Sequence, residues 1–117
     1  MRAIVLIDHG SRSDAANQVV ADVAAQLRDA HGVHVEIAHL EVAPPTTADA
    51  IEACVRAGAT ELVVVPYFLG PGRHATEDVP RLVADAMAGR TGVTARVAEP
   101  FGAHPLLVAL VAERAGL

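Results

Sequence analysis

Histidines and one acid follow the four apolar stretches of this chain, and residues of these types can bind a metal ion or move a proton. His9 comes directly after the first apolar stretch, and Glu41 comes after the second. His74 lies in the loop after the third stretch, and His104 lies in the loop after the fourth. Two imidazoles and a carboxylate that meet with open coordination positions suit Co(II), Fe(II), Ni(II) or Zn(II). Neutral imidazole also accepts a proton near pH 7.

None of the short metal-binding motifs accompanies these residues, because HExxH and CxxC are missing from the chain and none of these histidines belongs to a close doublet. A loop histidine can also cap a helix or lie on the surface, so position alone leaves the metal role open. The loop Gly70-Pro71-Gly72-Arg73-His74 is more informative. Its glycines and proline predict a fixed turn whose backbone can approach a ligand, unless it is only a structural link. In that turn Arg73 can offer its guanidinium to a carboxylate, while His74 points at a metal ion or a proton.

The stretches that must position these residues alternate between strand patterns and helix patterns. Apolar, β-branched or strictly alternating runs predict four strands, at residues 3–7, 33–40, 62–65 and 93–97. Helical spacing predicts four helices, at residues 14–30, from just after Thr46 to Gly58, at residues 78–88 and at residues 106–115. The stretch over residues 66–76, rich in Gly and Pro, is predicted to be a loop.

Local signals mark several helix ends. Gly32 is placed to terminate the first helix, and Thr46 with Asp49 forms a plausible capping box for the second. Pro80 falls in the first turn of the third helix, where proline is tolerated. The first helix is expected to place four apolar side chains on one face, which are Val19, Val20, Val23 and Leu27.

Four βα units in succession predict one α/β domain over residues 1–117, with a four-stranded parallel sheet, helices on both faces and right-handed crossovers. The run at 62–65 is the most apolar, so we expect it at the centre of the sheet. In open α/β sheets, ligands bind beyond the carboxyl ends of the strands, near the point where the strand order reverses. The histidines and Glu41 that follow the strands are therefore expected at that edge.

Charge and composition exclude several classes of protein. The formal net charge is -5, all nine basic residues are arginine, and tryptophan is absent, which argues against nucleic-acid binding. No apolar run approaches the ~20 residues of a membrane-spanning helix. No secretory signal precedes the first strand, so a cytoplasmic location is expected. Cys54 is the only cysteine, which excludes a disulfide framework, and it is expected to be a small buried residue.

Hydrophobic residues make up 52% of the chain, a high share for a domain of this size. Such a share indicates either that both faces of the sheet are covered or that an apolar surface meets a partner.

The segment Asp8-His9-Gly10-Ser11-Arg12 raises a competing interpretation. Histidine phosphatases use Arg-His-Gly at a strand end, with the histidine as nucleophile and arginines around the phosphate. Here Asp8 precedes His9, and a carboxylate at that position would repel a phosphate dianion. The phosphate-loop patterns GxGxxG and GxxxxGK[ST] are both missing, so no nucleotide is expected as a ligand.

Three groups of residues together resemble the short class II sirohydrochlorin chelatases of the CbiX type. They are Leu6-Ile7-Asp8-His9-Gly10-Ser11-Arg12 with Asn17, Leu40-Glu41 ahead of Pro44-Pro45, and Val64-Val65-Pro66-Tyr67-Phe68-Leu69 through Gly72-Arg73-His74 to Asp78-Val79-Pro80. The likeness extends over essentially the whole chain and ends with Gly102-Ala103-His104-Pro105. The resemblance implies insertion of Co(II) or Fe(II), with Ni(II) also open, into a sirohydrochlorin-type tetrapyrrole for cobalamin or sirohaem biosynthesis.

The resemblance also implies roles for individual residues. The histidines that match His9 and His74 are the metal-handling residues of that family, and the acid that matches Glu41 is associated with the same site. Four more residues are our candidates for contacts with the substrate, namely Arg12, Arg73, Ser11 and Tyr67. Beside Pro105, His104 is expected to cap the last helix. The remaining histidines are expected on the surface or behind the site, and they are His31, His34 and His39.

Assembly is implied as well. Larger class II chelatases enclose the tetrapyrrole between two similar α/β lobes, and this chain resembles one lobe, so a homodimer would supply the cleft. No cofactor beyond the substrate metal ion is implied. A tetrapyrrole or metal carrier without turnover is the alternative that this reasoning leaves open.

Overall fold

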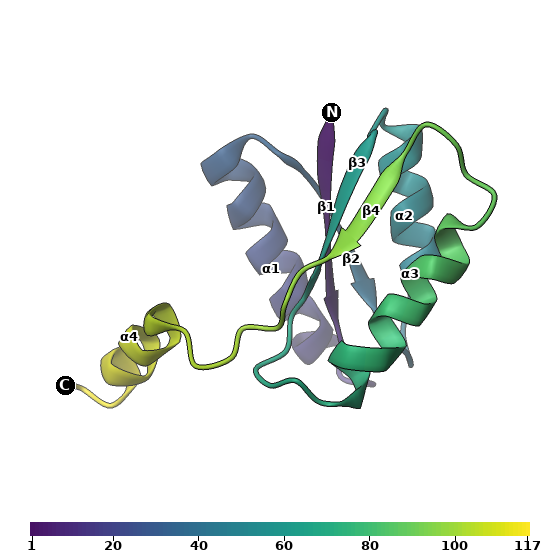
Figure 1. Ribbon diagram of the computed structural model, residues 1–117. Coiled ribbons are helices and arrows are strands. Elements are labelled where there is room, and N and C mark those ends of the chain that lie inside the picture. The colour runs from purple at the N-terminus through teal and green to yellow at the C-terminus, as the bar shows by residue number, and fades with distance from the viewer.

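The computed structural model describes residues 1–117 as an α/β fold built on one parallel sheet (Figure 1). The strands are β1 (Arg2–Asp8), β2 (His34–His39), β3 (Glu61–Pro66) and β4 (Thr94–Val97), in the spatial order β2-β1-β3-β4. The helices are α1 (Asp14–His31), α2 (Thr47–Arg56), α3 (Val79–Met87) and α4 (Pro105–Arg114), and a π-helical turn, η1 (His74–Asp78), precedes α3. The predicted parallel sheet and its order of elements are confirmed.

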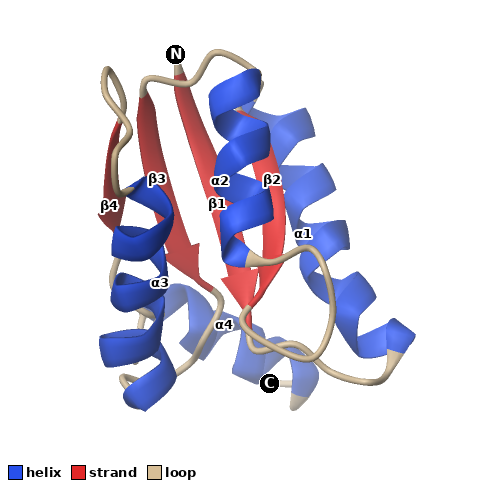
Figure 2. Ribbon diagram, turned by 90° about the vertical axis from the view of Figure 1, so that its right-hand side faces the viewer, coloured by secondary structure: helices blue, strands red, loops and turns tan.

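The sheet carries helices on both faces, as predicted. The chain moves from β1 to the edge strand β2, then returns past β1 to β3 and β4, so the direction of travel reverses once. Right-handed crossovers then place α1 on one face and both α2 and α3 on the other (Figure 1). Figure 2 shows α2 and α3 in front of the sheet, with α1 beyond it. The reversal lies between β1 and β3, whose following loops therefore diverge and leave a crevice.

Two apolar clusters hold these layers together. The larger one lies between the sheet and the α2–α3 layer, and includes Val5, Ile7, Ile51, Leu62 and Val64, all of them fully buried. The smaller one joins the sheet to α1 through Leu6, Val20, Ala24 and Val35. Alternate residues of β1 and β3 thus point into opposite clusters, as strand geometry requires. The central position predicted for the third strand is confirmed, because β3 has a neighbour on each side.

The helix signals in the sequence act as expected, with two exceptions. Gly32 ends α1 in the left-handed conformation, at φ +62°, and Thr46 with Asp49 forms the complete capping box of α2. The predicted apolar face of α1 was wrong at Val19, which is 47% exposed. Neighbours on a helix point about 100° apart, so Val20 takes the buried position and Val19 is turned outward. The loop predicted over 66–76 was also too long, because η1 begins at His74.

The last helix lies apart from the sheet. In Figure 1, α4 extends from the lower end of the molecule on the α1 side, beyond the other helices. None of its residues is buried, and Leu106 and Val111 are 75% and 67% exposed. Full burial of one such side chain contributes about 1.5–3 kcal/mol, so this arrangement leaves substantial stabilisation unused. No helix of the chain combines the length and apolar character that crossing a bilayer requires.

The fold makes a prediction about Cys54, which is completely buried in the larger cluster as expected. Burial, with a smaller contribution from the negative charge of Glu36, raises the pKa of Cys54 to about 11. At pH 8 only about one thiol in a thousand would then be the reactive thiolate. We expect the native protein not to react with iodoacetamide at pH 8, and the urea-unfolded protein to be alkylated once. Rapid alkylation of the native protein, measured by mass spectrometry, would contradict this placement.

Candidate metal centre

Parallel pairing of β1 with β2 brings His9 and Glu41 side by side. The register pairs Asp8 with His39, and the hydrogen bonding continues beyond both strand ends. The Leu40 amide donates to the Asp8 carbonyl at 2.8 Å, and the Glu41 amide donates to the His9 carbonyl at 3.2 Å. Backbone hydrogen bonds therefore hold His9 and Glu41 next to each other, although the two residues lie far apart in the chain.

Gly10 makes this close approach possible. Its φ is +91°, and a Cβ atom built there would lie 2.0 Å from the Glu41 carbonyl oxygen and 3.2 Å from the Cβ of His39. The first of these distances lies far inside van der Waals contact with a backbone atom, which cannot swing away as a flexible side chain can. Only glycine combines this conformation with this proximity. The glycine after His9 is thus a requirement of the geometry.

His74 is supplied by the first turn after the β3 loop. His74 is the first residue of η1, and Asp78, four residues later, lies on the same side of the turn. The Nδ1 atom of His74 is 2.8 Å from Oδ2 of Asp78. Because a carboxylate only accepts hydrogen bonds, this contact fixes the proton on Nδ1 and leaves the Nε2 lone pair free.

His9 has an oxygen acceptor near each of its ring nitrogens. Its Nδ1 faces the Gly10 carbonyl oxygen at 3.3 Å, an atom that can only accept. Its Nε2 atom lies 3.1 Å from Nε2 of His74 and 3.3 Å from Oε1 of Glu41. Two imidazole nitrogens and a carboxylate oxygen therefore converge on one point. Such a set repels itself unless a proton or a metal cation occupies the space between.

The spacing of the three ligand atoms suits one metal ion. All of them lie within 4.8 Å of one another. Ligand atoms bound at about 2.0–2.1 Å to a tetrahedral ion lie ~3.3 Å apart, close to the two short distances given above. The structure thus brings together the residues that the sequence singled out as metal ligands. Their roles in metal handling remain predictions.

The site is open on one side. The side chains of His9, Glu41 and His74 are 47%, 55% and 42% exposed. A hollow of about 340 Å³ adjoins the two histidines, and its other lining residues are Phe68, Leu69, Gly70, Gly72 and Ala75. Phe68 and Leu69 form an apolar wall of this hollow. A flat apolar ligand can therefore approach the histidines along this wall, and the metal ligands lie where the wall ends.

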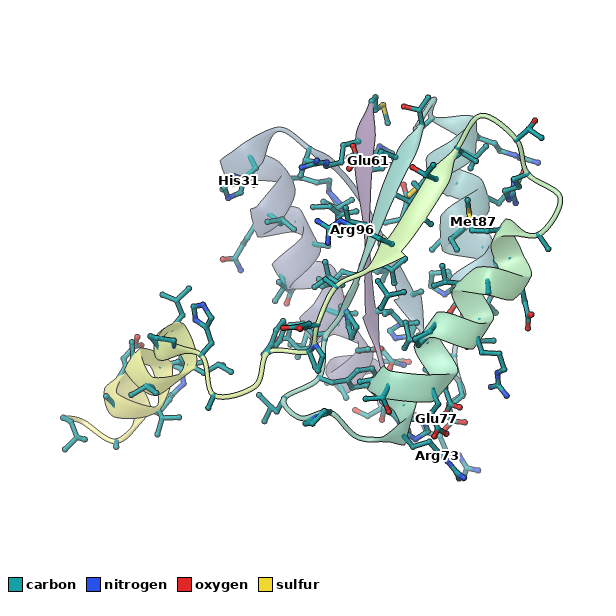
Figure 3. The ribbon with its side chains drawn as sticks, viewed as in Figure 1. His31, Glu61, Arg73, Glu77, Met87 and Arg96 are labelled. Atoms are coloured by element: carbon teal, nitrogen blue, oxygen red, sulfur yellow. The ribbon has the colours of Figure 1, made fainter.

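The four predicted substrate contacts lie outside the cluster, since none of them hydrogen-bonds to its members. Arg73 pairs with Glu77 at 3.4 Å, and both side chains extend into solvent at the lower end of the molecule (Figure 3). Arg12 is exposed on the loop before α1. Ser11 is held in its turn, where its backbone exchanges two hydrogen bonds with the Asn17 side chain. Their contacts with a substrate remain predictions.

Tyr67, the fourth of these residues, packs toward the α1 side of the sheet. Its ring meets Phe101 edge-on, with the ring centroids 5.2 Å apart. His104 does not join the cluster either. Its Nδ1 accepts a hydrogen bond from the Leu106 amide at 3.1 Å, which confirms the predicted helix cap.

Sequence reasoning missed the support that Asp78 gives to the cluster, and it left His39 open between the surface and a position behind the site. The sequence analysis names Asp78 only within the motifs that carry the family resemblance and gives it no role. The stretch before Asp78 was predicted to be a loop, whereas it forms a turn with helical spacing. His39 is 3% exposed, and its Nδ1 is hydrogen-bonded to Oδ1 of Asp8, so the buried pair anchors the residue that precedes His9. The strand register pairs Asp8 with His39, and this pairing was the signal that could have revealed the supporting role of His39.

Comparison with known proteins gives a matching family and several named relatives. The chain matches the family model described as CbiX over residues 3–116. A chloroplastic sirohydrochlorin ferrochelatase from Arabidopsis thaliana is 39% identical over 112 residues, which is 95% of this chain and 50% of that protein. A sirohydrochlorin cobaltochelatase from Methanococcoides burtonii is 33% identical over 121 residues, which is 96% of this chain and 92% of that protein.

A solved structure shares the fold. The sirohydrochlorin chelatase SirB from Bacillus subtilis subspecies spizizenii, crystallised in complex with cobalt, is 32% identical, with a TM-score of 0.91. The match covers 98% of this chain and 50% of that one. The chain therefore spans about half the length of SirB and of the Arabidopsis protein.

The first prediction from the site concerns Gly10. We expect Gly10→Ala to weaken Co(II) binding and to lower the free energy of unfolding, because the new methyl group displaces the Glu41 backbone. Gly58→Ala is the matched control, since Gly58 has φ +100° but open space around it. The control should show only the conformational cost, about 1–2 kcal/mol, and normal Co(II) binding. Equal losses in both variants, measured by urea unfolding and Co(II) titration, would refute the role given to Gly10.

The second prediction concerns Asp78. Removing the carboxylate in Asp78→Ala should weaken Co(II) binding about 10–100-fold, because His74 loses the partner that fixes its tautomer and orientation. The visible absorbance of bound Co(II) measures this affinity. Glu77→Ala removes the neighbouring carboxylate, which pairs with Arg73 instead, and should leave the affinity unchanged. An unaltered Co(II) titration of Asp78→Ala would exclude the assigned role.

Proposed function

Since the chain belongs to the CbiX family, we propose that it inserts a divalent metal ion, Co(II) or Fe(II), into sirohydrochlorin. The observation that carries the proposal is the convergence of two imidazole Nε2 atoms and a carboxylate oxygen beside an open hollow. The named relatives of this chain include both ferrochelatases and cobaltochelatases, so they support metal insertion without selecting one ion. Ni(II) is a third candidate, because imidazole ligands suit it too.

The reaction exchanges two protons for one metal ion. The ion must lose its water ligands, the macrocycle must lose two pyrrole N–H protons, and the metal then binds the freed nitrogens. In our proposal His9 and His74 hold the incoming ion through Nε2, and three protein ligands leave its remaining positions open to the macrocycle. As the ion leaves the protein, the same lone pairs become available to accept the pyrrole protons.

The two histidines are not equivalent in this scheme. Asp78 contacts His74 on the side away from the metal centre through a charged hydrogen bond, which keeps its ring in place. The Nδ1 of His9 meets only a neutral carbonyl at 3.3 Å. We therefore assign His74 as the more persistent ligand and His9, next to Glu41, as the residue that passes a proton to the carboxylate.

Substrate binding is proposed to use the hollow and the surrounding basic residues. The apolar wall over Phe68 and Leu69 would contact one face of the macrocycle. Arg12 and Arg73 would meet its peripheral carboxylates, with Ser11 and Tyr67 nearby. For Arg73 this requires release from Glu77, an exposed pair that costs little to separate. No nucleotide takes part in the proposed reaction.

We also propose that the active form is a homodimer that works in the cytoplasm. The open side of the hollow and the uncovered helix α4 both support pairing with a second subunit. The lone buried thiol agrees with a reducing compartment, where disulfides are rare.

Substitution of the two histidines tests the function. We expect His9→Ala and His74→Ala each to lower the rate of Co(II) insertion into sirohydrochlorin by about 10²–10⁴, with no nucleotide added. The change in the absorbance spectrum of the macrocycle measures the rate. His31→Ala is the control, because His31 lies exposed at the far end of α1 (Figure 3) and should leave the rate unchanged.

The same assay separates the alternatives. A carrier would bind sirohydrochlorin or metal stoichiometrically without accelerating the spectral change over the uncatalysed reaction. A histidine phosphatase would hydrolyse a phosphomonoester, although the carboxylates of Glu41 and Asp8 would repel the phosphate group of that substrate. Full activity in both histidine variants would remove the proposed mechanism.

A further inference from the structure

One hydrogen bond beside the metal centre has no part in the reaction proposed above. It joins Nδ1 of His39, the last residue of β2, to Oδ1 of Asp8, the last residue of β1. The parallel register sets the two residues opposite each other. Both side chains are shielded from water, at 3% and 16% exposure. The carboxylate accepts and the ring Nδ1 donates, so the loss of either partner would leave the other without a hydrogen bond in a buried position.

This pair links residues 8–12 with residues 39–43, the two segments that carry His9 and Glu41. Main-chain hydrogen bonds between the two segments set their spacing. Apart from the contact of His9 with Glu41, the buried pair is the only side-chain hydrogen bond or ion pair between them. It is therefore the one side-chain link between the segments that is made outside the set of metal ligands.

The pair lies on the α1 side of the metal centre. Side chains alternate along a strand, so Asp8 lies on the same face of β1 as Leu6, which packs toward α1. His74 enters from η1, directly before α3, and α3 covers the opposite face of the sheet (Figure 2). Two histidine–carboxylate pairs, His39 with Asp8 and His74 with Asp78, therefore flank the centre from the two faces.

His39 meets both neighbours of His9 in the chain. It holds Asp8 by the hydrogen bond, and a Cβ atom built on Gly10 would lie 3.2 Å from the Cβ of His39. His39 is itself held in place, since its amide donates to the Pro45 carbonyl at 2.9 Å. A side chain held in this way can determine the path of the main chain on either side of His9.

We propose that His39 is a positioning residue for the metal centre, which acts through Asp8 to hold the His9 ring at the correct distance from Glu41. His39 touches neither the metal ion nor the macrocycle. Metal ligands must be held within about 0.5 Å of their productive positions, so a small displacement of His9 weakens binding. This role belongs to the step in which the protein holds the ion, and it therefore rests on the proposed function.

Two substitutions of His39 separate positioning from packing. The side-chain nitrogen of asparagine is bonded to Cγ, as Nδ1 is in histidine, so His39→Asn keeps a donor for Asp8. His39→Leu occupies the same apolar surroundings without a donor. If His39 only fills space, the two folded variants bind Co(II) equally well. If it positions His9, we expect His39→Asn to bind Co(II) close to wild-type affinity and His39→Leu to bind it about 10-fold more weakly.

Titration of the 117-residue chain with Co(II), followed by the visible absorbance of the bound ion, measures both affinity and ligand geometry. His39→Leu should shift the absorption bands as well as the dissociation constant, because His9 changes its position relative to the other ligands. His34→Leu is the matched control. His34 forms a second histidine–carboxylate pair, with Glu36 at 2.6 Å, but it stands opposite Ala3 at the far end of β2. This control should bind Co(II) as the wild type does.

A double variant keeps the test decisive if His39→Leu fails to fold. Asp8→Leu/His39→Leu replaces both partners by apolar side chains, which restores much of the stability that is lost when one buried partner stands alone. It does not restore the hydrogen bond, so Co(II) binding should stay weak while resistance to urea recovers. A role in stability alone predicts that the affinity recovers together with the stability.

Three results would overturn the proposal. They are unaltered Co(II) affinity and absorbance in His39→Leu, equal losses in His39→Asn and His39→Leu, and recovery of both stability and Co(II) affinity in the double variant. None of these readouts requires turnover. A wild type whose Co(II) binding depends on His39 but which inserts no metal would leave this inference standing and remove the proposed function. Normal metal insertion together with unaltered Co(II) binding in His39→Leu would do the reverse.

Discussion

The backbone contact between the ends of β1 and β2 is the constraint on which the site depends. It holds the segment after each strand close enough for the amide of Glu41 to reach the carbonyl of His9. A side chain at Gly10 would occupy the position of the Glu41 carbonyl, so the contact requires glycine there. The neighbouring ligand residues are then positioned by main-chain hydrogen bonds, which are stiffer than contacts between long side chains.

The third ligand residue lies on the other side of the point where the strand order reverses, between β1 and β3. His74 comes from beyond β3, and the π-helical turn places Asp78 behind it. Each histidine thereby faces an oxygen acceptor with its Nδ1 atom and directs the opposite nitrogen toward the same point. Protein structure and ligand chemistry are linked at this step, because the hydrogen bonds that orient the rings also decide which nitrogen can bind a cation.

The apolar surplus of the sequence is distributed unevenly over the fold. The α2–α3 side of the sheet has a complete core, whereas α1 covers only part of the other face. Many of the exposed apolar side chains lie on α4, near the same end of the molecule as the metal centre (Figure 1). Stability and function therefore both depend on what covers this end of the molecule, because the segment before α4 is hydrogen-bonded to residues that line the hollow.

The sequence alone determined the features that depend on neighbouring residues. Strand and helix periodicity, Gly32 and the Thr46–Asp49 box predicted the strands and the α-helices to within two residues at each end, because these signals act within a few residues of themselves. The π-helical turn η1 was not predicted. The sequence also placed His9, Glu41 and His74 after strand ends. Tertiary structure decided the 3.1 Å approach of the two imidazoles, the support from Asp78 and His39, and the separation of α4. These depend on strand register and on the packing of distant segments, which no local pattern encodes.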